Sequence, residues 1–328
     1  MARPIAHRTP AAPNKPLHAV PTLGLAVALA LGTALARAHG LDDAAPPAGL
    51  QAATAWSFEP AVLLPLLASG LLYAWGARAL LARVRRGAAV QRWRAAAFAL
   101  GWAALMAALV SPLDTLGGWL FSAHMVQHEL MMIVAAPLLV LGRPLAAWVW
   151  AFGPAGRARL GRTVRQPGVA TAWRWLNTPL VAWGLHAIAL WGWHVPGLFN
   201  AALRHPAVHF LQHTSFLATA LLFWSAVLEH QRQHAASGAA MLALFTTMVH
   251  TTALGALLTL APLPWYPFYS TTTSALGVDL LQDQQLGGLV MWVPGALAYL
   301  FAGLAVTSRW LRQSAGPGGT AHGKAASP

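Results

Sequence analysis

The sequence predicts an all-α integral membrane protein, and three observations support this fold class. Hydrophobic residues make up 57% of its 328 residues. Charged residues make up only 9%, whereas soluble domains carry roughly a quarter. Apolar stretches recur along the chain, most of them near the roughly 20 residues that a helix needs to cross a bilayer. We therefore expect a seven-transmembrane-helix bundle without a soluble domain.

The N-terminus is typical of an export signal. Basic residues precede an apolar segment at 20–35, and a small-x-small cleavage pattern ends at Ala38. We expect residues 1–38 to act as a signal peptide or a retained signal anchor. A periplasmic segment is expected over 39–57, the membrane domain over 58–312, and a disordered cytoplasmic tail over 313–328.

Seven spans and the charges between them predict an orientation. The spans run approximately over residues 61–81, 95–110, 119–141, 179–193, 207–228, 239–260 and 286–308. Arginines concentrate after the first, third, fifth and seventh spans, and acidic residues dominate the opposite loops. By the positive-inside rule, the first span begins outside and the C-terminus is cytoplasmic after signal removal. This pattern predicts a multi-pass protein of the bacterial inner (plasma) membrane.

The net charge of +13 does not indicate a nucleic-acid-binding protein. The arginines lie between apolar segments, as in cytoplasmic loops, and no basic groove with interleaved aromatics is evident. The connection at 143–177 combines arginines with tryptophans, and we expect it to contact membrane lipid at the headgroups. The sequence has no cysteine, which excludes disulfides and thiolate metal ligands.

Two histidine motifs, HMVQH at 124–128 and HFLQH at 209–213, are the strongest functional signal. Positions i and i+4 share one face of a helix, so His124 with His128, and His209 with His213, each present two imidazoles together. Ionisable side chains inside a membrane are costly and indicate a functional site. The orientation places both motifs in the outer half of the bilayer. The sequence therefore predicts a metal site there.

Further candidates lie on other spans. His194 is expected near the same outer face and His250 near mid-membrane, where each completes or relays the site. The possible supporting residues are Gln127, Gln212, Glu129, His186, Met248, Asp283 and His39.

The supporting residues have distinct expected roles. The two glutamines would orient imidazoles or connect helices, and Met248 would be a soft ligand or core filler. Glu129 would carry protons or metal, and Asp283 would collect ions at the mouth. If cleavage follows Ala38, His39 becomes an N-terminal copper chelator. His186 or His250 taken singly is equally well explained as a hydrogen-bonded core histidine.

Several motifs in order resemble the CtaG-type cytochrome c oxidase assembly factors, the polytopic seven-helix kind. The matching motifs are HMVQHE at 124–129, APL at 136–138, GRP at 142–144, WGWHVP at 191–196, HFLQH at 209–213, DQQLGG at 283–288 and MW at 291–292. The resemblance covers roughly residues 58–312. It implies a plasma-membrane protein that helps to mature a haem-copper oxidase. The sequence shows no catalytic triad, phosphate loop or paired carboxylates, so we expect no enzymatic turnover.

Taken together, we expect an assembly factor that binds copper through these histidines and hands it to the oxidase. Oxidase subunits are the expected partners, with periplasmic copper chaperones as further ones. Zinc remains open, since imidazole suits both metals. The alternatives are a haem-binding electron-transfer protein, a metal-free scaffold for oxidase subunits and, ranked lower, a transporter.

Overall fold

The computed structural model describes residues 50–83, 87–229 and 234–314, and within these ranges it is all-helical without strands. The predicted signal segment, His39 and most of the predicted tail lie outside the described residues. The expectations about cleavage, N-terminal chelation and the tail therefore stay predictions.

Long helices form the body of the molecule and short ones form its two ends. The long helices are α3 (Pro60–Leu81), α4 (Ala88–Leu109), α11 (Pro179–His194), α13 (Pro206–Glu229), α14 (His234–Thr259), α16 (Leu280–Ser314), and the continuous run of α6 (Phe121–Glu129), π-helix η1 (Leu130–Ala135) and α7 (Ala136–Gly142). The short helices are α2 (Leu50–Ala53), α5 (Pro112–Gly117), α8 (Pro144–Ala151), α9 (Pro154–Val164), α10 (Pro167–Leu176), α12 (Pro196–Arg204), the 3₁₀ helix η3 (Pro267–Tyr269) and α15 (Ser270–Ala275). Proline opens most of them, because its fixed φ suits the first helical position, where no N–H is needed.

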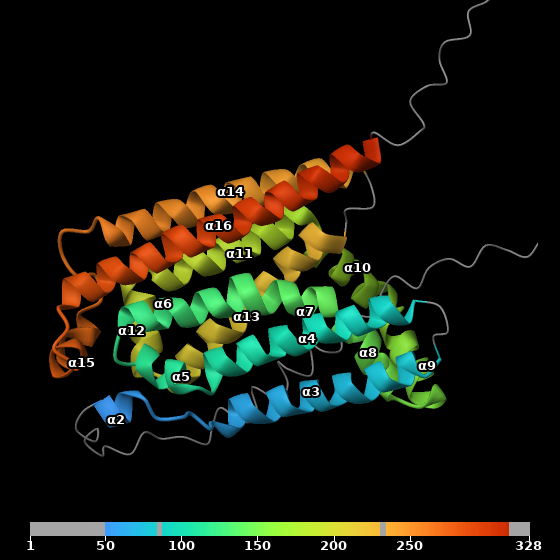
Figure 1. Ribbon diagram of the computed structural model, residues 1–328, viewed down its shortest axis with the longest axis horizontal. Coiled ribbons are helices and arrows are strands. Elements are labelled where there is room, and N and C mark those ends of the chain that lie inside the picture. Colours follow the sequence, from blue (N-terminus) through green and yellow to red (C-terminus); the bar gives the residue numbers. More distant parts are fainter. Residues whose placement is uncertain (1–49, 84–86, 230–233, 315–328) are drawn as a thin grey trace, which may run out of the picture.

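In the part of the chain that the structure describes, five helices are long and apolar enough to cross a membrane. They are Pro60–Leu81, Phe121–Gly142, Pro206–Leu228, Gly238–Thr259 and Leu280–Arg312. The other two predicted spans correspond to α4, which carries Arg92 and Arg94 in its first two turns, and to α11, which has 16 residues. Both run alongside the long helices (Figure 1).

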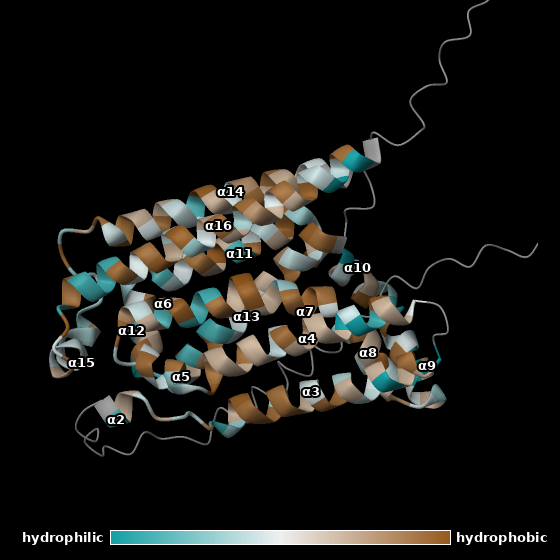
Figure 2. Ribbon diagram, viewed as in Figure 1, coloured by the Kyte–Doolittle hydropathy of each residue, from teal (hydrophilic) through white to brown (hydrophobic). Residues whose placement is uncertain are grey.

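The bundle is arranged so that one end carries α5, α12 and α15 and the other carries α8, α9 and α10 (Figure 1). Between these ends, α14 packs along α16, α3 packs on α4 and α8, and α11 packs on α13. Apolar residues dominate the middle of the helices, and polar ones gather towards their ends (Figure 2). Large apolar side chains also face outwards, such as Leu71 at 70%, Trp75 at 72% and Leu180 at 76% exposure. An outward apolar surface of this kind suits lipid.

Glycines allow two helix pairs to approach closely. A Cβ at Gly255 of α14 would lie 2.8 Å from the carbonyl oxygen of Gly288 in α16. A Cβ at Gly76 of α3 would overlap the carbonyl of Ala147 in α8. Small residues at such crossings are the usual device for packing helices in a membrane.

The third predicted span contains a π-helical turn, which begins directly after Glu129. Pro137, near the start of α7, has no N–H, so carbonyls one turn earlier lose a helical partner. The indole N–H of Trp224 in α13 donates to one of them, the carbonyl of Met132, at 2.9 Å. The distortion is thus stabilised by a neighbouring helix, and it lies one turn inward of the histidines. π-turns of this kind are frequent at functional sites.

Candidate metal centre

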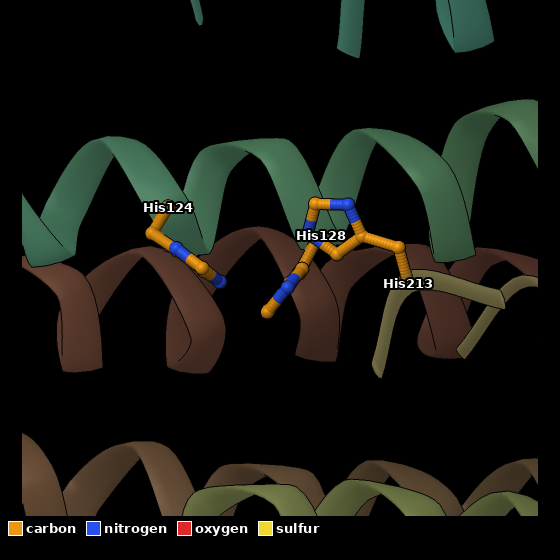
Figure 3. Close-up of side chains that lie close together, drawn as sticks. All are labelled: His124, His128 and His213. Carbon is orange, nitrogen blue, oxygen red and sulfur yellow. The ribbon is translucent and has the colours of Figure 1, made fainter. Parts of the chain in front are cut away.

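Three imidazoles from α6 and α13 converge inside the bundle. One ring nitrogen each of His124, His128 and His213 lies within 4.8 Å of the others. The ring of His128 lies between those of His124 and His213 (Figure 3). Ring centroids are 4.3 Å apart for His124 and His128, and 5.2 Å apart for His128 and His213. All three side chains are at most 9% exposed.

His209 and His194 lie at the margin of this trio. The His209 ring centroid is 4.1 Å from that of His213 and 5.5 Å from that of His124. His194, at the end of α11, contacts Phe199 and Phe216, whose rings also contact the trio. Thus each of the two predicted motifs contributes both of its histidines to one region of the structure.

Hydrogen bonds fix the tautomers of two of these rings. Nδ1 of His124 lies 3.3 Å from the carbonyl oxygen of Gly117, and Nδ1 of His194 lies 2.6 Å from that of Leu190. A carbonyl only accepts, so in both rings Nδ1 carries the hydrogen and Nε2 holds a lone pair. A backbone carbonyl on one nitrogen is the usual way in which a metal-binding histidine is oriented.

The remaining nitrogens of the cluster are buried without partners. Among the described residues, no hydrogen bond is made by Nε2 of His124, His194, His209 or His213, or by either nitrogen of His128. A buried polar atom without a partner costs about 1–3 kcal/mol, so this many in one place calls for an explanation. A cation bound by the lone pairs would satisfy them together, so the donor set fits a metal ion.

Aromatic side chains cover the outer side of the cluster. Phe121 and Phe199 pack with Tyr266 and Tyr269, and all four are buried. The Tyr266 hydroxyl donates to the carbonyl of His194 at 2.8 Å, and the Tyr269 hydroxyl donates to that of Gly117 at 2.9 Å. The segment that carries these tyrosines therefore holds the backbone next to two of the histidines.

Asp283 has a structural partner in the described chain. Its carboxylate accepts the backbone N–H of Phe121 at 2.6 Å and that of Ser122 at 3.2 Å, and it also accepts the Ser122 hydroxyl. These are the free donors at the start of α6, so Asp283 caps that helix from α16. Only 2% of the side chain is exposed. Capping of α6 therefore explains why this carboxylate is buried, and a bound ion is not needed to explain it.

The two glutamines of the motifs differ in their contacts. Gln127 donates to the carbonyl of Ala108 at 2.9 Å and to Asp114 at 2.7 Å, so it connects α6 to α4 and α5. Within the described ranges, Gln212 meets no hydrogen-bond geometry at either amide atom, but its side chain lies beside the ring of His124.

The deeper candidates lie apart from the trio. Both nitrogens of His186 have neighbours, Thr219 at 3.3 Å and the Tyr299 hydroxyl at 3.4 Å, as in a hydrogen-bonded core histidine. His250 contacts Trp183, with ring centroids 6.1 Å apart. The carboxyl of Glu129 lies close to Gly295, where an added Cβ would be 3.2 Å from Oε2. Met248 packs against the hydrophobic core.

Sequence reasoning missed the surface residue His205, the tyrosines of the outer cover and the link between Asp114 and Gln127. His205 lies four residues before His209, and extending the i, i+4 spacing by one step would have found it. The tyrosines had no local signal, because their partners are 72 and 152 residues away in the sequence.

Comparison with known proteins gives a family match. The family model described as cytochrome c oxidase caa3 assembly factor (Caa3_CtaG) matches residues 71–313. Uncharacterized proteins of Mycobacterium bovis and Mycobacterium tuberculosis are each 26% identical over 287 residues, which is 84% of this chain and 42% of theirs. One of Mycobacterium leprae is 25% identical over 289 residues, with the same shares covered. The chain thus spans about two-fifths of the length of these relatives, and no solved structure matches it.

Proposed function

This chain belongs to the family of cytochrome c oxidase caa3 assembly factors, and we propose that it assists the oxidase by binding copper and handing it over. Oxidase subunits are then its partners, and membership of an assembly-factor family is consistent with a role without enzymatic turnover. Periplasmic copper chaperones are proposed as donors.

The observation that supports this proposal is the convergence of unpartnered imidazole nitrogens. His124, His128 and His213 would be the primary ligands, because their nitrogens already lie within 4.8 Å of one another. Metal–imidazole bonds are about 2 Å long, so two nitrogens on one ion are at most about 4 Å apart and the rings need only a small adjustment. His209 and His194 would complete or relay the site. Imidazole ligands suit copper and exchange readily, as release to a client requires.

Membrane orientation favours delivery outside the cytoplasm. We propose seven crossings in the bacterial plasma membrane, with α4 and α11 added to the five candidate spans. The arginine-bearing helices α9 and α10 occupy one end of the bundle, and the start of α6, which carries His124, lies towards the other (Figure 1). The positive-inside rule assigns the arginine end to the cytoplasm, so the histidines lie towards the periplasm.

Haem binding is less well supported. Axial ligation needs two imidazoles on opposite faces of a porphyrin. Four of the histidines, His124, His128, His209 and His213, are in direct ring contact, with His128 and His213 only 5.2 Å apart between ring centroids, and such contacts leave no slot for a flat macrocycle. Zinc would fit the same donors, and the experiment below distinguishes it.

The test is metal content of the purified protein in detergent. We expect a stoichiometric amount of copper in the wild type, and loss of most of it in the His128→Ala/His213→Ala variant, because two of three ligands are removed. His250→Ala is the matched control, since it removes a membrane histidine outside the trio. Elemental analysis reports copper and zinc together, and an optical spectrum reports haem.

A second measurement separates the copper role from a metal-free scaffold. In cells with the double variant, we expect normal amounts of this protein but less copper in the oxidase. A wild type that carries no copper, or a double variant that lowers only protein abundance, would reject the proposal.

A further inference from the structure

A metal ion can load the buried histidine cluster only if it has a route from the surface. The aromatic side chains that cover the cluster, Phe121, Phe199, Tyr266 and Tyr269, close the direct route. Tyr266 and Tyr269, both at most 1% exposed, bond to backbone next to His194 and His124. An ion that reaches the trio must therefore come from another direction or displace these contacts. The side of α13 offers an alternative.

His205, His209 and His213 follow one another at intervals of four residues, with His205 just before α13 and the other two on one face of that helix. His209 donates its backbone N–H to the carbonyl of His205 at 3.0 Å, so this carbonyl belongs to the first turn of α13, while the backbone of His205 itself is extended and lies just before the helix. The interval from His209 to His213 advances roughly 6 Å along the axis, and these two positions lie nearly above one another.

Burial increases along this series of histidines. His205 is exposed, His209 is partly buried, and His213 is 9% exposed and belongs to the trio. The last two rings are in contact, with centroids 4.1 Å apart. Nε2 of His209 and of His213 has no hydrogen-bond partner in the part of the chain that the structure describes. Unpartnered donors thus continue from near the surface to the site.

We propose that His205 captures a soft metal cation at the surface and passes it through His209 to His213 and the trio. This inference rests on the proposed function, since it requires the trio to bind metal. Each transfer forms a new metal–nitrogen bond as the previous one breaks, so the oxidation state of the ion does not change. Unlike thiolates, imidazoles hold copper loosely enough for such exchange.

His205 has no competing role among the described residues. Its imidazole makes no hydrogen bond there, and its backbone alone continues the helix through the bonds from Val208 and His209. Its removal should therefore leave the fold and the buried ligands intact. The rate of metal loading therefore reports on His205 without an effect on the fold or on the buried ligands.

The experiment measures Cu(I) loading of the full chain in detergent, with the ion supplied by the chromogenic chelator bicinchoninate. We expect His205→Ala to slow loading by at least about tenfold while final stoichiometry stays that of the wild type. His205→Met should restore the rate, because a neutral thioether also binds Cu(I) and, unlike a thiolate, releases it readily. The control His205→Ala/Ala207→His restores the imidazole on another side of α13 and should stay slow.

The outcomes separate this inference from the proposal beneath it. Wild-type protein that takes up no Cu(I) rejects both. Uptake by His205→Ala at the wild-type rate rejects transfer from His205 through His209 and does not affect the proposed copper site. A lower final stoichiometry in His205→Ala would make His205 a ligand of the site itself, which also overturns this transfer.

Discussion

A histidine has two ring nitrogens, and the partner of one decides what the other does. In His124 and His194 a carbonyl holds Nδ1, and Nε2 is left for a ligand. In His186 both nitrogens have protein neighbours, Thr219 and Tyr299. These residues look alike in the sequence. The spacing of the motifs predicts which rings share a helix face, but it does not predict these partners, because Thr219 and Tyr299 are 33 and 113 residues away.

Asp114 illustrates how burial affects a residue outside the candidate spans. Burial raises the pKa of its carboxyl to about 6 from 3.8, although hydrogen bonds from Ser57 and Gln127 lower it. The folded chain therefore binds this proton more tightly than the unfolded chain. Its contribution to stability is complete below about pH 4 and is lost as the pH rises through about 6.

We predict that Asp114→Asn weakens the pH dependence of stability. The melting temperature of the wild type in detergent should fall from about pH 4 to about pH 7, and that of the variant should fall less. Asparagine keeps an acceptor for Gln127 but carries no charge to bury. Asp279→Asn, at an exposed aspartate just before α16, is the control and should follow the wild type. Equal slopes in all three proteins would contradict the prediction.

At the scale of elements, helix ends and crossings depend on contacts far apart in the sequence. The seventh span was predicted to begin near residue 286, but α16 begins at Leu280. Polar Asp283 and Gln284 resemble a loop in the sequence, yet each is 2% exposed because they bond α6 and the backbone of Trp265. Tertiary contacts thus outweigh local polarity. The apolar cores of the spans, by contrast, follow from composition.

The crossing of α14 and α16 gives a prediction for the helix pair. In Gly288→Ala, the added methyl would lie 2.5 Å from Oγ1 of Thr259 and 2.7 Å from the carbonyl oxygen of Gly255. We expect a loss of about 1–3 kcal/mol or more in the free energy of unfolding, because backbone must move to make room. Thermal unfolding in detergent measures it.

Gly303→Ala is the matched control on the same helix. A Cβ there has no neighbour within 4 Å among the described residues. Alanine should be neutral or stabilise α16 by up to about 1 kcal/mol through its helix propensity. If Gly288→Ala and Gly303→Ala have the same melting temperature, the close crossing of α14 and α16 does not determine the stability of the helix pair.

For the whole molecule, the charge pattern predicts which end faces which compartment. The chain has no cysteine, so a single introduced thiol reports its own location. We expect Ser274→Cys in α15 to react with a membrane-impermeant maleimide on intact spheroplasts. Arg159→Cys in α9 should react only after lysis; both native residues are exposed. The reverse pattern would invert the proposed orientation and place the histidines near the cytoplasm.

The proposed ligands are all uncharged when they donate a lone pair. They would therefore leave the full charge of a guest ion uncompensated in apolar surroundings, and that penalty rises steeply with valence. A singly charged ion is thus tolerated far better than a doubly charged one. Such a pocket would select a metal ion first by its oxidation state and only then by its element. Oxidation of the bound ion would therefore favour its release.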